Sequence, residues 1–297
     1  MGGQMTDLAQ NVAGELTALP PARRDLKRSR KNPIVVRISK LQPLIVPMAI
    51  LLLWELVVRM GLIPPGLLSS PSGIAKGLSV WAFGPAGNGM NAYSGTLLSN
   101  MLNSGERVFE GFLVAIVVGV PTGLMIGYNK SFAKTFDPFI QSMRPVPITA
   151  WMPVSLTLFG ISGLSAISLI SLGAFYPIVI NSAMGARDIN KQFVRAARMM
   201  GASPRQLMMR VIVPNALPAI FVGLRLGIGV AWTAVVIAEM VAVKSGLGYV
   251  LWDAYYIGRM EIVLGDMVAI GLLGFLSDCL IVAIERRVLH WKQYNSR

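Results

Sequence analysis

The sequence predicts an all-α integral membrane protein with about six transmembrane helices and with both termini in the cytoplasm. Hydrophobic residues make up 54% of the 297 residues, and the mean hydropathy is +0.60. Such values are typical of membrane proteins. Charged residues amount to only 14%. None of them lies between Arg144 and Arg187, a stretch long enough to cross a bilayer twice at about 20 residues per span.

Six apolar segments each approach the length of a membrane span. They cover residues 43 to 60, 108 to 128, 138 to 159, 163 to 185, 219 to 243 and 262 to 284. The third contains Pro138, Pro145, Pro147 and Pro153. Because each proline removes a backbone donor, we expect a broken helix there, buried in protein or lining a cavity.

The distribution of basic residues predicts the topology. Most of the 27 Lys and Arg residues fall in segments that six crossings place in the cytoplasm, as the positive-inside rule requires. The chain then divides into a basic, disordered tail (1–42), a transmembrane domain (43–285) and a C-terminal cytoplasmic tail (286–297). Topology thus explains the net charge of +13, and we expect contact with membrane lipid and none with nucleic acid. The outer connection, 61–105, should be irregular with a short helix at most.

The inventory of reactive residues argues against an enzyme. With one cysteine, Cys279, and one histidine, His290, we expect no disulfide framework, no metal site and no Ser-His-Asp triad. The phosphate-binding pattern Gly-x-x-x-x-Gly-Lys-Ser/Thr does not occur. We therefore expect the chain itself to bind no cofactor and to hydrolyse no ATP.

A polar insertion, 186–218, separates the fourth and fifth apolar segments. Apolar residues at helical spacing beside a basic stripe predict an amphipathic helix that ends at Gly201. Ser203, Pro204 and Gln206 then predict the N-cap and capping box of a second helix, which we expect to stop at Pro214. The insertion is therefore predicted to be a helical hairpin facing the cytoplasm. A hairpin that merely lies on the membrane surface is the alternative.

The motifs of this hairpin and of several other segments resemble one family. The run from Arg195 to Ser203, followed by 214–220, resembles the EAA loop of bacterial ABC importer permeases, except that Arg195 stands where a glutamate is usual. Further segments resemble the branch of permeases that serves nitrate, bicarbonate, taurine and alkanesulfonates. They are Leu62–Pro65, Ser70–Ser72, Arg144–Pro147, Ala150–Pro153, Gly223–Arg225, Ala238–Met240 and Leu251–Ala254.

This resemblance implies a type I ABC importer permease in the bacterial cytoplasmic (inner) membrane. It also implies two ATPase subunits that bind ATP and Mg²⁺, a second permease copy, and a periplasmic or lipoprotein solute-binding protein. By the same resemblance, the hairpin docks on an ATPase through Arg195, Ala196, Ala197, Arg198, Gly201, Ala202, Ser203, Pro214 and Pro218. An ion-gradient-driven transporter or channel that uses Asp266 and Asp278 is the alternative function.

Arg144 is the main candidate for the solute path. A charged side chain in a span should be paired or face water, and basic residues in a pore favour anions. Pairing with Glu239, Asp266 or Asp278, or snorkelling to the interface, is the alternative. We add Trp151, Glu239 and Trp232 to the candidate path.

Three smaller expectations complete the sequence reading. Glu55 and Arg59 should form a local pair. The Gly-x-x-x-Gly spacing of Gly223 and Gly227 should allow close helix packing, more within the subunit than between copies. On the outer side, an aromatic-rich segment suggests a gate or a docking surface for the binding protein, with an interfacial aromatic belt as the alternative. Its candidate residues are Trp252, Asp253 and Tyr255.

Overall fold

The computed structural model describes residues 33–64, 66–85 and 93–290, with only the backbone described for 33–44. All of the secondary structure in this part of the chain is helical. Most of the predicted N-terminal tail (1–42) and of the C-terminal tail (286–297) lies outside these residues. The chain forms two units, residues 1–51 and 52–297. Helix α2 (Pro33–Arg59) begins in the first and ends in the second, and every other described element belongs to the second.

The second unit is built from long helices joined by short ones. Its elements are α3 (Pro71–Phe83), α4 (Leu97–Tyr128), α5 (Lys130–Met143), η1 (Ile148–Trp151), α6 (Met152–Phe159), α7 (Gly163–Arg187), α8 (Lys191–Met199), α9 (Pro204–Leu207), η2 (Met208–Ile212), α10 (Val213–Ala242), α11 (Leu247–Tyr256) and α12 (Met260–Val288).

Four helical stretches among the described residues are long and apolar enough to span a membrane: Leu97–Tyr128, Gly163–Arg187, Pro204–Ala242 and Met260–Val288. They coincide with the second, fourth, fifth and sixth predicted segments. The first predicted segment, 43 to 60, falls almost entirely within α2. Within α2, Glu55 accepts a bond from Arg59 at 2.6 Å, which confirms the predicted local pair.

The third predicted segment, 138 to 159, forms no single spanning helix. Helix α5 ends at Met143, Pro147 precedes the short 3₁₀ turn η1, and α6 then adds only eight residues. Prolines end regular helix because they lack an amide donor and clash with the preceding turn. The predicted break is confirmed. Because of the break, neither α5 nor the stretch formed by η1 and α6 is long enough to span the membrane by itself.

The outer connection is shorter than predicted. Residues 71–83 form the expected short helix, α3, but α4 begins at Leu97, within the range 61–105 that we assigned to the loop. The first turns of α4 carry Asn100, Ser104 and Arg107, whose polar side chains are directed to partners inside the protein. Hydropathy alone therefore missed these turns.

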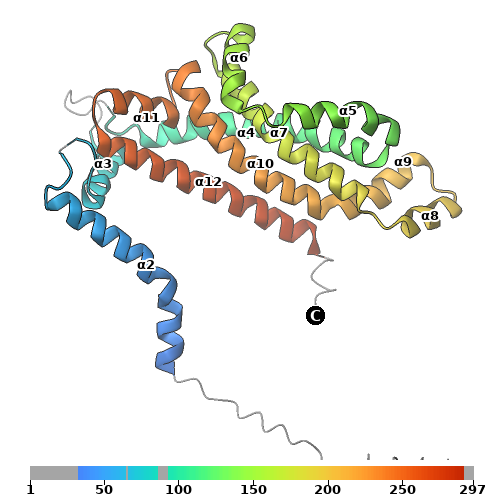
Figure 1. Cartoon of the computed structure of the whole chain (residues 1–297), viewed down its shortest axis with the longest axis horizontal. Helices are drawn as coiled ribbons and strands as arrows, with labels where there is room; N and C mark the ends of the chain where they lie inside the picture. The colour runs from blue at the N-terminus through green and yellow to red at the C-terminus, as the bar shows by residue number, and fades with distance from the viewer. Residues whose placement is uncertain (1–32, 65, 86–92, 291–297) are drawn as a thin grey trace, which may run out of the picture. The chain divides into compact units, whose positions relative to one another are not determined.

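The core of the second unit lies between α4, α7, α10, α11 and α12, with residues such as Val108, Ile170, Ile178, Phe221 and Val235 (Figure 1). At Gly223, an added Cβ would lie 2.9 Å from the Cβ of Asn181 and 3.0 Å from the carbonyl oxygen of Pro177. Only a residue without a side chain permits α7 and α10 to approach this closely. The glycine spacing therefore serves packing within the subunit, as expected.

Pro214 does not end the second hairpin helix, contrary to our prediction. Residues Pro204–Ala242 form one continuous helical stretch, in which η2 is a π-helical turn directly before α10. The wider turn accommodates the ring and missing amide of Pro214, since π-turns absorb such local defects. The Asn215 side-chain amide donates to the Val211 carbonyl at 2.7 Å. The second hairpin helix and the following span are therefore one continuous helical stretch, hereafter the rod, which bends where α9 meets α10 (Figure 1).

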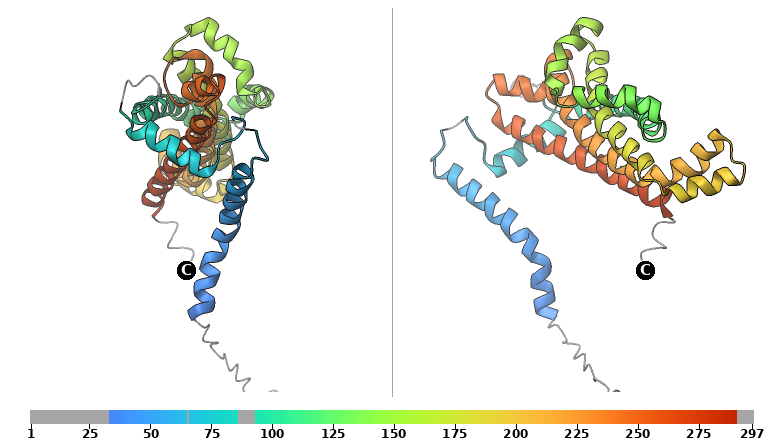
Figure 2. Two further views of the ribbon diagram at one scale, coloured as in Figure 1. Left: turned by 90° about the vertical axis from the view of Figure 1, so that its left-hand side faces the viewer. Right: turned by 45° about the vertical axis from the view of Figure 1, so that its right-hand side comes forward.

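The two ends of this unit carry different structures. Helices α8 and α9 project from one end of the bundle, and α3 and α11 lie at the other, as the views in Figures 1 and 2 show. The rod of α9, η2 and α10 runs from the hairpin toward α11. Under the predicted topology, the hairpin end faces the cytoplasm.

Candidate functional site

The hairpin has the local geometry that the sequence predicted. Helix α8 ends before Gly201, whose φ of +79° is the left-handed conformation that favours glycine. The hydroxyl of Ser203 accepts from the Gln206 amide at 3.3 Å, and the Ser203 amide donates to Gln206 Oε1 at 2.9 Å. This reciprocal capping box satisfies two helix-end donors. The capping box and the left-handed Gly201 therefore define the turn between the two helices.

One side of the hairpin is anchored and the other is exposed. Ala197, Leu207 and Ile212 are buried together with Leu124 and Ala186 from the spanning helices. The other side presents Arg195, Ala196 and Arg198, followed by Met199 and Met200, which are 89% and 81% exposed. Large exposed apolar side chains beside charges are typical of interaction surfaces. Of the residues predicted to contact an ATPase, Pro214 lies at the start of α10 and Pro218 lies within it.

Arg144 caps the C-terminal end of α5 and lines a cavity of about 480 Å³. The cavity also contains Tyr176 and Asn181 from α7 and Leu226 and Val230 from α10. None of the ion pairs among the described residues includes Arg144; Glu239 pairs with Arg107, and Asp278 pairs with Arg225. The guanidinium is exposed. Two of the three structural partners that we considered for Arg144 are thus paired with other arginines.

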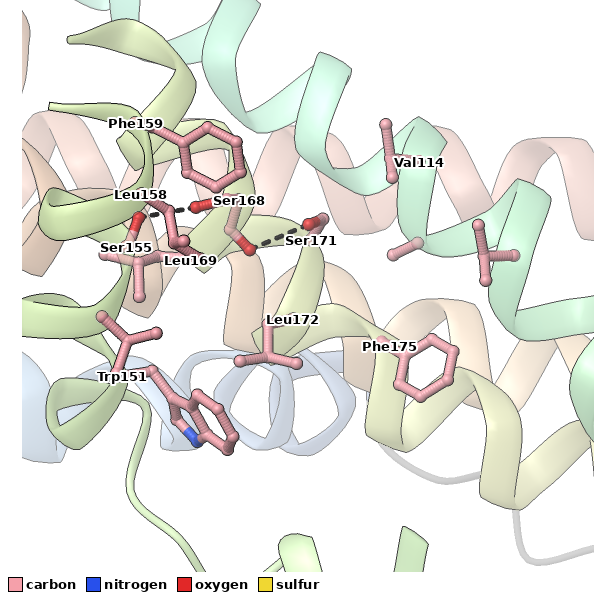
Figure 3. A pocket seen from close by; sticks show the side chains of 13 residues that line it. Val114, Trp151, Ser155, Leu158, Phe159, Ser168, Leu169, Ser171, Leu172 and Phe175 are labelled. Atoms are coloured by element: carbon pink, nitrogen blue, oxygen red, sulfur yellow. Dashed lines mark hydrogen bonds between the residues drawn. The ribbon is translucent and has the colours of Figure 1, made fainter. Parts of the chain in front are cut away.

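Trp151 lines a different, apolar cavity of about 370 Å³ between α4, α6 and α7. Figure 3 shows its indole beside Leu172, with Ser155 and Ser168 on the neighbouring wall. The hydroxyls of Ser155 and Ser168 are 2.7 Å apart. The indole N–H is buried and has no hydrogen-bond partner in the described structure. Trp151 and Arg144 therefore do not share one cavity.

Trp232 and Glu239 lie on α10 but are also separate from Arg144. Trp232 is 6% exposed and donates to the Ser277 hydroxyl at 3.1 Å. It borders a cavity of about 530 Å³ between α10 and α12. In that cavity Arg225 makes two bonds to Asp278, at 2.8 and 3.0 Å. Arg225 thus has a carboxylate partner on α12.

Glu239 is completely buried, and its carboxylate lines none of the four cavities described in the second unit. It pairs with Arg107 at 2.6 Å and accepts from the Ser104 hydroxyl and the Gly248 amide. A path-lining role for Glu239 would require a conformation other than this one. Sequence reasoning missed Ser104 and Arg107 because both precede the apolar part of α4.

The outer aromatic helix α11 carries a cluster of exposed rings. Trp252 stacks on Tyr255 with a centroid distance of 5.9 Å and meets Tyr256 edge-on at 5.1 Å. Asp253 instead turns inward and accepts from the Tyr93 hydroxyl at 2.5 Å. Burial, and then the Asp253 carboxylate, raises the pKa of Tyr93, so the hydroxyl keeps its proton. Of the three predicted residues, Trp252 and Tyr255 are available on the surface of α11.

Taken together, the helical bundle, the broken third segment and the capped hairpin are the features expected of a membrane permease of the ABC importer type. The chain belongs to the binding-protein-dependent transport system inner membrane component family, whose model matches residues 115–290. It is thus a multi-pass inner membrane protein, as the sequence predicted.

Similar proteins place the chain in the predicted branch of nitrate, taurine and sulfonate permeases. It is 30% identical to the putative aliphatic sulfonates transport permease SsuC of Bacillus subtilis, covering 89% of this chain and 92% of that protein. It is 34% identical to the taurine transport system permease TauC of Escherichia coli, covering 82% and 86%. It is 37% identical to the nitrate import permease NrtB of Synechococcus elongatus, covering 63% and 68%.

A solved structure confirms the fold. A chain of the MetNI methionine ABC transporter, in an inward-facing conformation, matches with a TM-score of 0.58 at 22% identity. The match covers 65% of this chain and 95% of that chain. The protein therefore has the type I ABC importer permease fold, as predicted.

Proposed function

We propose that this protein is the permease subunit of an ABC importer that moves a small anion of the nitrate, sulfonate or bicarbonate class by alternating access. The observation that carries the anion assignment is Arg144. Its guanidinium lines a cavity of about 480 Å³ and belongs to no ion pair of the described residues. A cation in a water-accessible site within a membrane protein attracts anions.

The character of the cavity fits a small polar anion. Besides Arg144 it offers the Tyr176 ring and the Asn181 side chain, while Leu226 and Val230 supply apolar contact. Asn181 Nδ2 already donates to the Pro177 carbonyl. An anion would therefore be held chiefly by Arg144. The names of the relatives, which include sulfonate, taurine and nitrate permeases, favour the same class of solute.

The hairpin supports a separate ATPase as the source of energy. Its exposed tip combines Arg195 and Arg198 with Met199 and Met200 and is fixed to the bundle by buried Ala197 and Leu207. A rigid lever of this kind transmits movement from a partner to the spanning helices. In this proposal two ATPase subunits bind ATP and Mg²⁺, whereas this chain binds no cofactor.

Two further partners complete the proposed transporter. A second copy of this chain would place two Arg144 cavities in one assembly, as a homodimer. A periplasmic or lipoprotein solute-binding protein would deliver the anion to the outer end, where Trp252 and Tyr255 are exposed on α11.

One observation favours an ion-gradient-driven transporter as a second candidate. Asp266 in α12 is completely buried, and neither of its carboxylate oxygens has a hydrogen-bond partner in the described structure. Buried acids in membrane proteins often carry protons or sodium ions. Asp278, the other acid considered, is engaged by Arg225, so only Asp266 supports this candidate.

Uptake by proteoliposomes tests the proposal. The permease is reconstituted with its candidate ATPase and binding protein, and labelled nitrate, taurine, an alkanesulfonate and bicarbonate are offered with and without ATP. We expect ATP-dependent uptake of one of these anions. Uptake that follows an imposed proton or sodium gradient without the ATPase would contradict the ABC mechanism and favour the Asp266 alternative.

A further inference from the structure

Glu239 is the centre of a buried polar cluster at the end of the bundle opposite the hairpin. Its Oε1 lies 2.6 Å from Arg107 Nη1, and both carboxylate oxygens accept from the Ser104 hydroxyl at 2.9 and 2.8 Å. Arg107 also donates to the backbone oxygen and hydroxyl of Ser245, at 3.0 and 2.7 Å. The cluster therefore joins α4, α10 and the residues that lead into α11.

The same cluster caps the N-terminus of α11. The amide of Gly246 donates to Asn100 Oδ1 at 3.0 Å, that of Leu247 to the Ser104 hydroxyl at 2.8 Å, and that of Gly248 to Glu239 Oε2 at 2.9 Å. The first amides of a helix have no partner within the helix, and its N-terminus favours negative charge. The Glu239 carboxylate thus meets both an arginine and the positive end of α11.

The backbone is shaped to receive this carboxylate. Gly246 has a φ of +104°, and an added Cβ there would lie 2.4 Å from Glu239 Oε1. At Gly248 an added Cβ would lie 2.5 Å from the Val236 carbonyl oxygen and 2.9 Å from the Glu239 Cβ. The start of α11 is therefore pressed against α10 at the position of Glu239.

Glu239 also lies at the far end of the rod that begins in the hairpin. Helix α10 continues η2 and α9 without interruption, from Pro204 beside the capping box to Ala242. At about 1.5 Å per residue, this stretch of 39 residues is about 58 Å long. The hairpin and Glu239 are therefore connected through one continuous helical stretch.

We propose that Glu239 is a positioning residue that fixes the outer helix α11 to the α10 rod, so that movement of the hairpin repositions the exposed aromatic face of α11. The proposal rests on the proposed function, because it assumes that an ATPase moves the hairpin. In this proposal Glu239 transmits movement between the two ends of the permease and does not contact the solute.

Spin labels near the hairpin and on α11 test this coupling. In a Cys279→Ser background, one label is placed at Met209→Cys in η2 and another, in a separate protein, at Tyr256→Cys in α11; these residues are 61% and 70% exposed. Each protein is reconstituted with the ATPase and trapped with a non-hydrolysable ATP analogue. With Glu239 present, we expect the spectra of both labels to change on trapping.

In the Glu239→Gln variant, the label at position 209 should still respond, and the response at position 256 should fall at least twofold. Glutamine keeps the shape of the side chain but removes the charge that Arg107 and the α11 amides share. Glu106→Gln is the matched control, an exposed acid on α4 next to Arg107, and it should leave both responses unchanged. If Glu239→Gln does not fold, Ser104→Ala removes one hydroxyl of the same cluster. It should likewise keep the response at position 209 and reduce the response at position 256.

A full response at position 256 in the folded variants would overturn the proposal. The proposal would also be overturned if, with Glu239 intact, the label at position 209 responds and the label at position 256 does not. If position 209 gives no response even with Glu239 intact, the proposed function fails instead, because nucleotide then does not move the hairpin.

Discussion

Three arginines of the bundle differ in how their charge is compensated. Arg107 is 15% exposed and bonded to buried Glu239, and Arg225 makes two bonds to Asp278. Arg144 faces its cavity and shares in no ion pair of the described residues. The first two arginines therefore contribute to the architecture, and the third is available to a solute.

We expect Arg144→Gln to weaken anion recognition. A hydrogen bond to a charged group contributes about 1.5–3 kcal/mol, so the loss should raise the half-saturating anion concentration for uptake roughly 10- to 100-fold. Uptake at graded anion concentrations in proteoliposomes measures it. Lys134→Gln is the control, an exposed cation on α5, the helix that Arg144 caps. Equal effects of the two substitutions would show that Arg144 acts only through general charge.

Asp278→Asn tests whether Asp278 has only a structural role as the partner of Arg225. Because Asp278 is bonded to Arg225 and the pair is partly exposed, its loss should cost about 0–1 kcal/mol of stability and leave ATP-dependent uptake largely intact. Uptake and thermal unfolding in detergent measure the two effects. Complete loss of uptake by a normally folded Asp278→Asn protein would instead favour a proton or sodium site there.

At the scale of elements, the proposed coupling to the ATPase depends on the turn of the hairpin. Gly201 adopts a left-handed φ, and Ala202 packs partly against the buried cluster under the hairpin. We expect Gly201→Asp or Ala202→Asp to abolish transport while leaving membrane insertion normal, because each distorts or charges the predicted docking turn. Uptake and membrane fractionation check this. A variant that still transports would count strongly against the proposed role of the hairpin in coupling the ATPase to the spanning helices.

The packing of α10 on α7 allows a matched pair of glycine substitutions. Gly223→Ala should destabilise the protein by about 1–3 kcal/mol, because the methyl group would collide with Asn181 and the Pro177 carbonyl. Gly229→Ala, on the same helix, meets nothing within 4 Å and should have little effect. Thermal unfolding of both variants checks the difference. Similar melting temperatures would mean that the helices separate without cost.

For the whole molecule, basic residues are concentrated at the hairpin, and we expect them to favour an acidic surface on the proposed ATPase partner. Between Asp188 and Glu239 the chain contains no acidic residue, while Lys191, Arg195 and Arg198 are exposed on α8. We expect Arg195→Glu to weaken the association of the permease with the ATPase subunits. The association of the variant should also depend less on ionic strength. Co-purification at low and high salt measures this. Unchanged co-purification at every salt concentration would show that Arg195 lies outside the docking surface.

The sequence by itself determined the all-α membrane class, the type I permease family, the capped hairpin, the break at Pro145 and Pro147 and the local Glu55–Arg59 pair. The family depends on the resemblance of its motifs to those of known permeases, and the other features depend on hydropathy, on proline and glycine chemistry and on residues close together in the chain. Only the tertiary structure decided that Glu239 joins Arg107 and caps α11, that Arg225 joins Asp278, and that Pro214 lies within a continuous rod. The physical reason is that a charge buried in the bundle selects whatever partner the packing of distant helices brings within hydrogen-bond reach, and no local pattern records that distance.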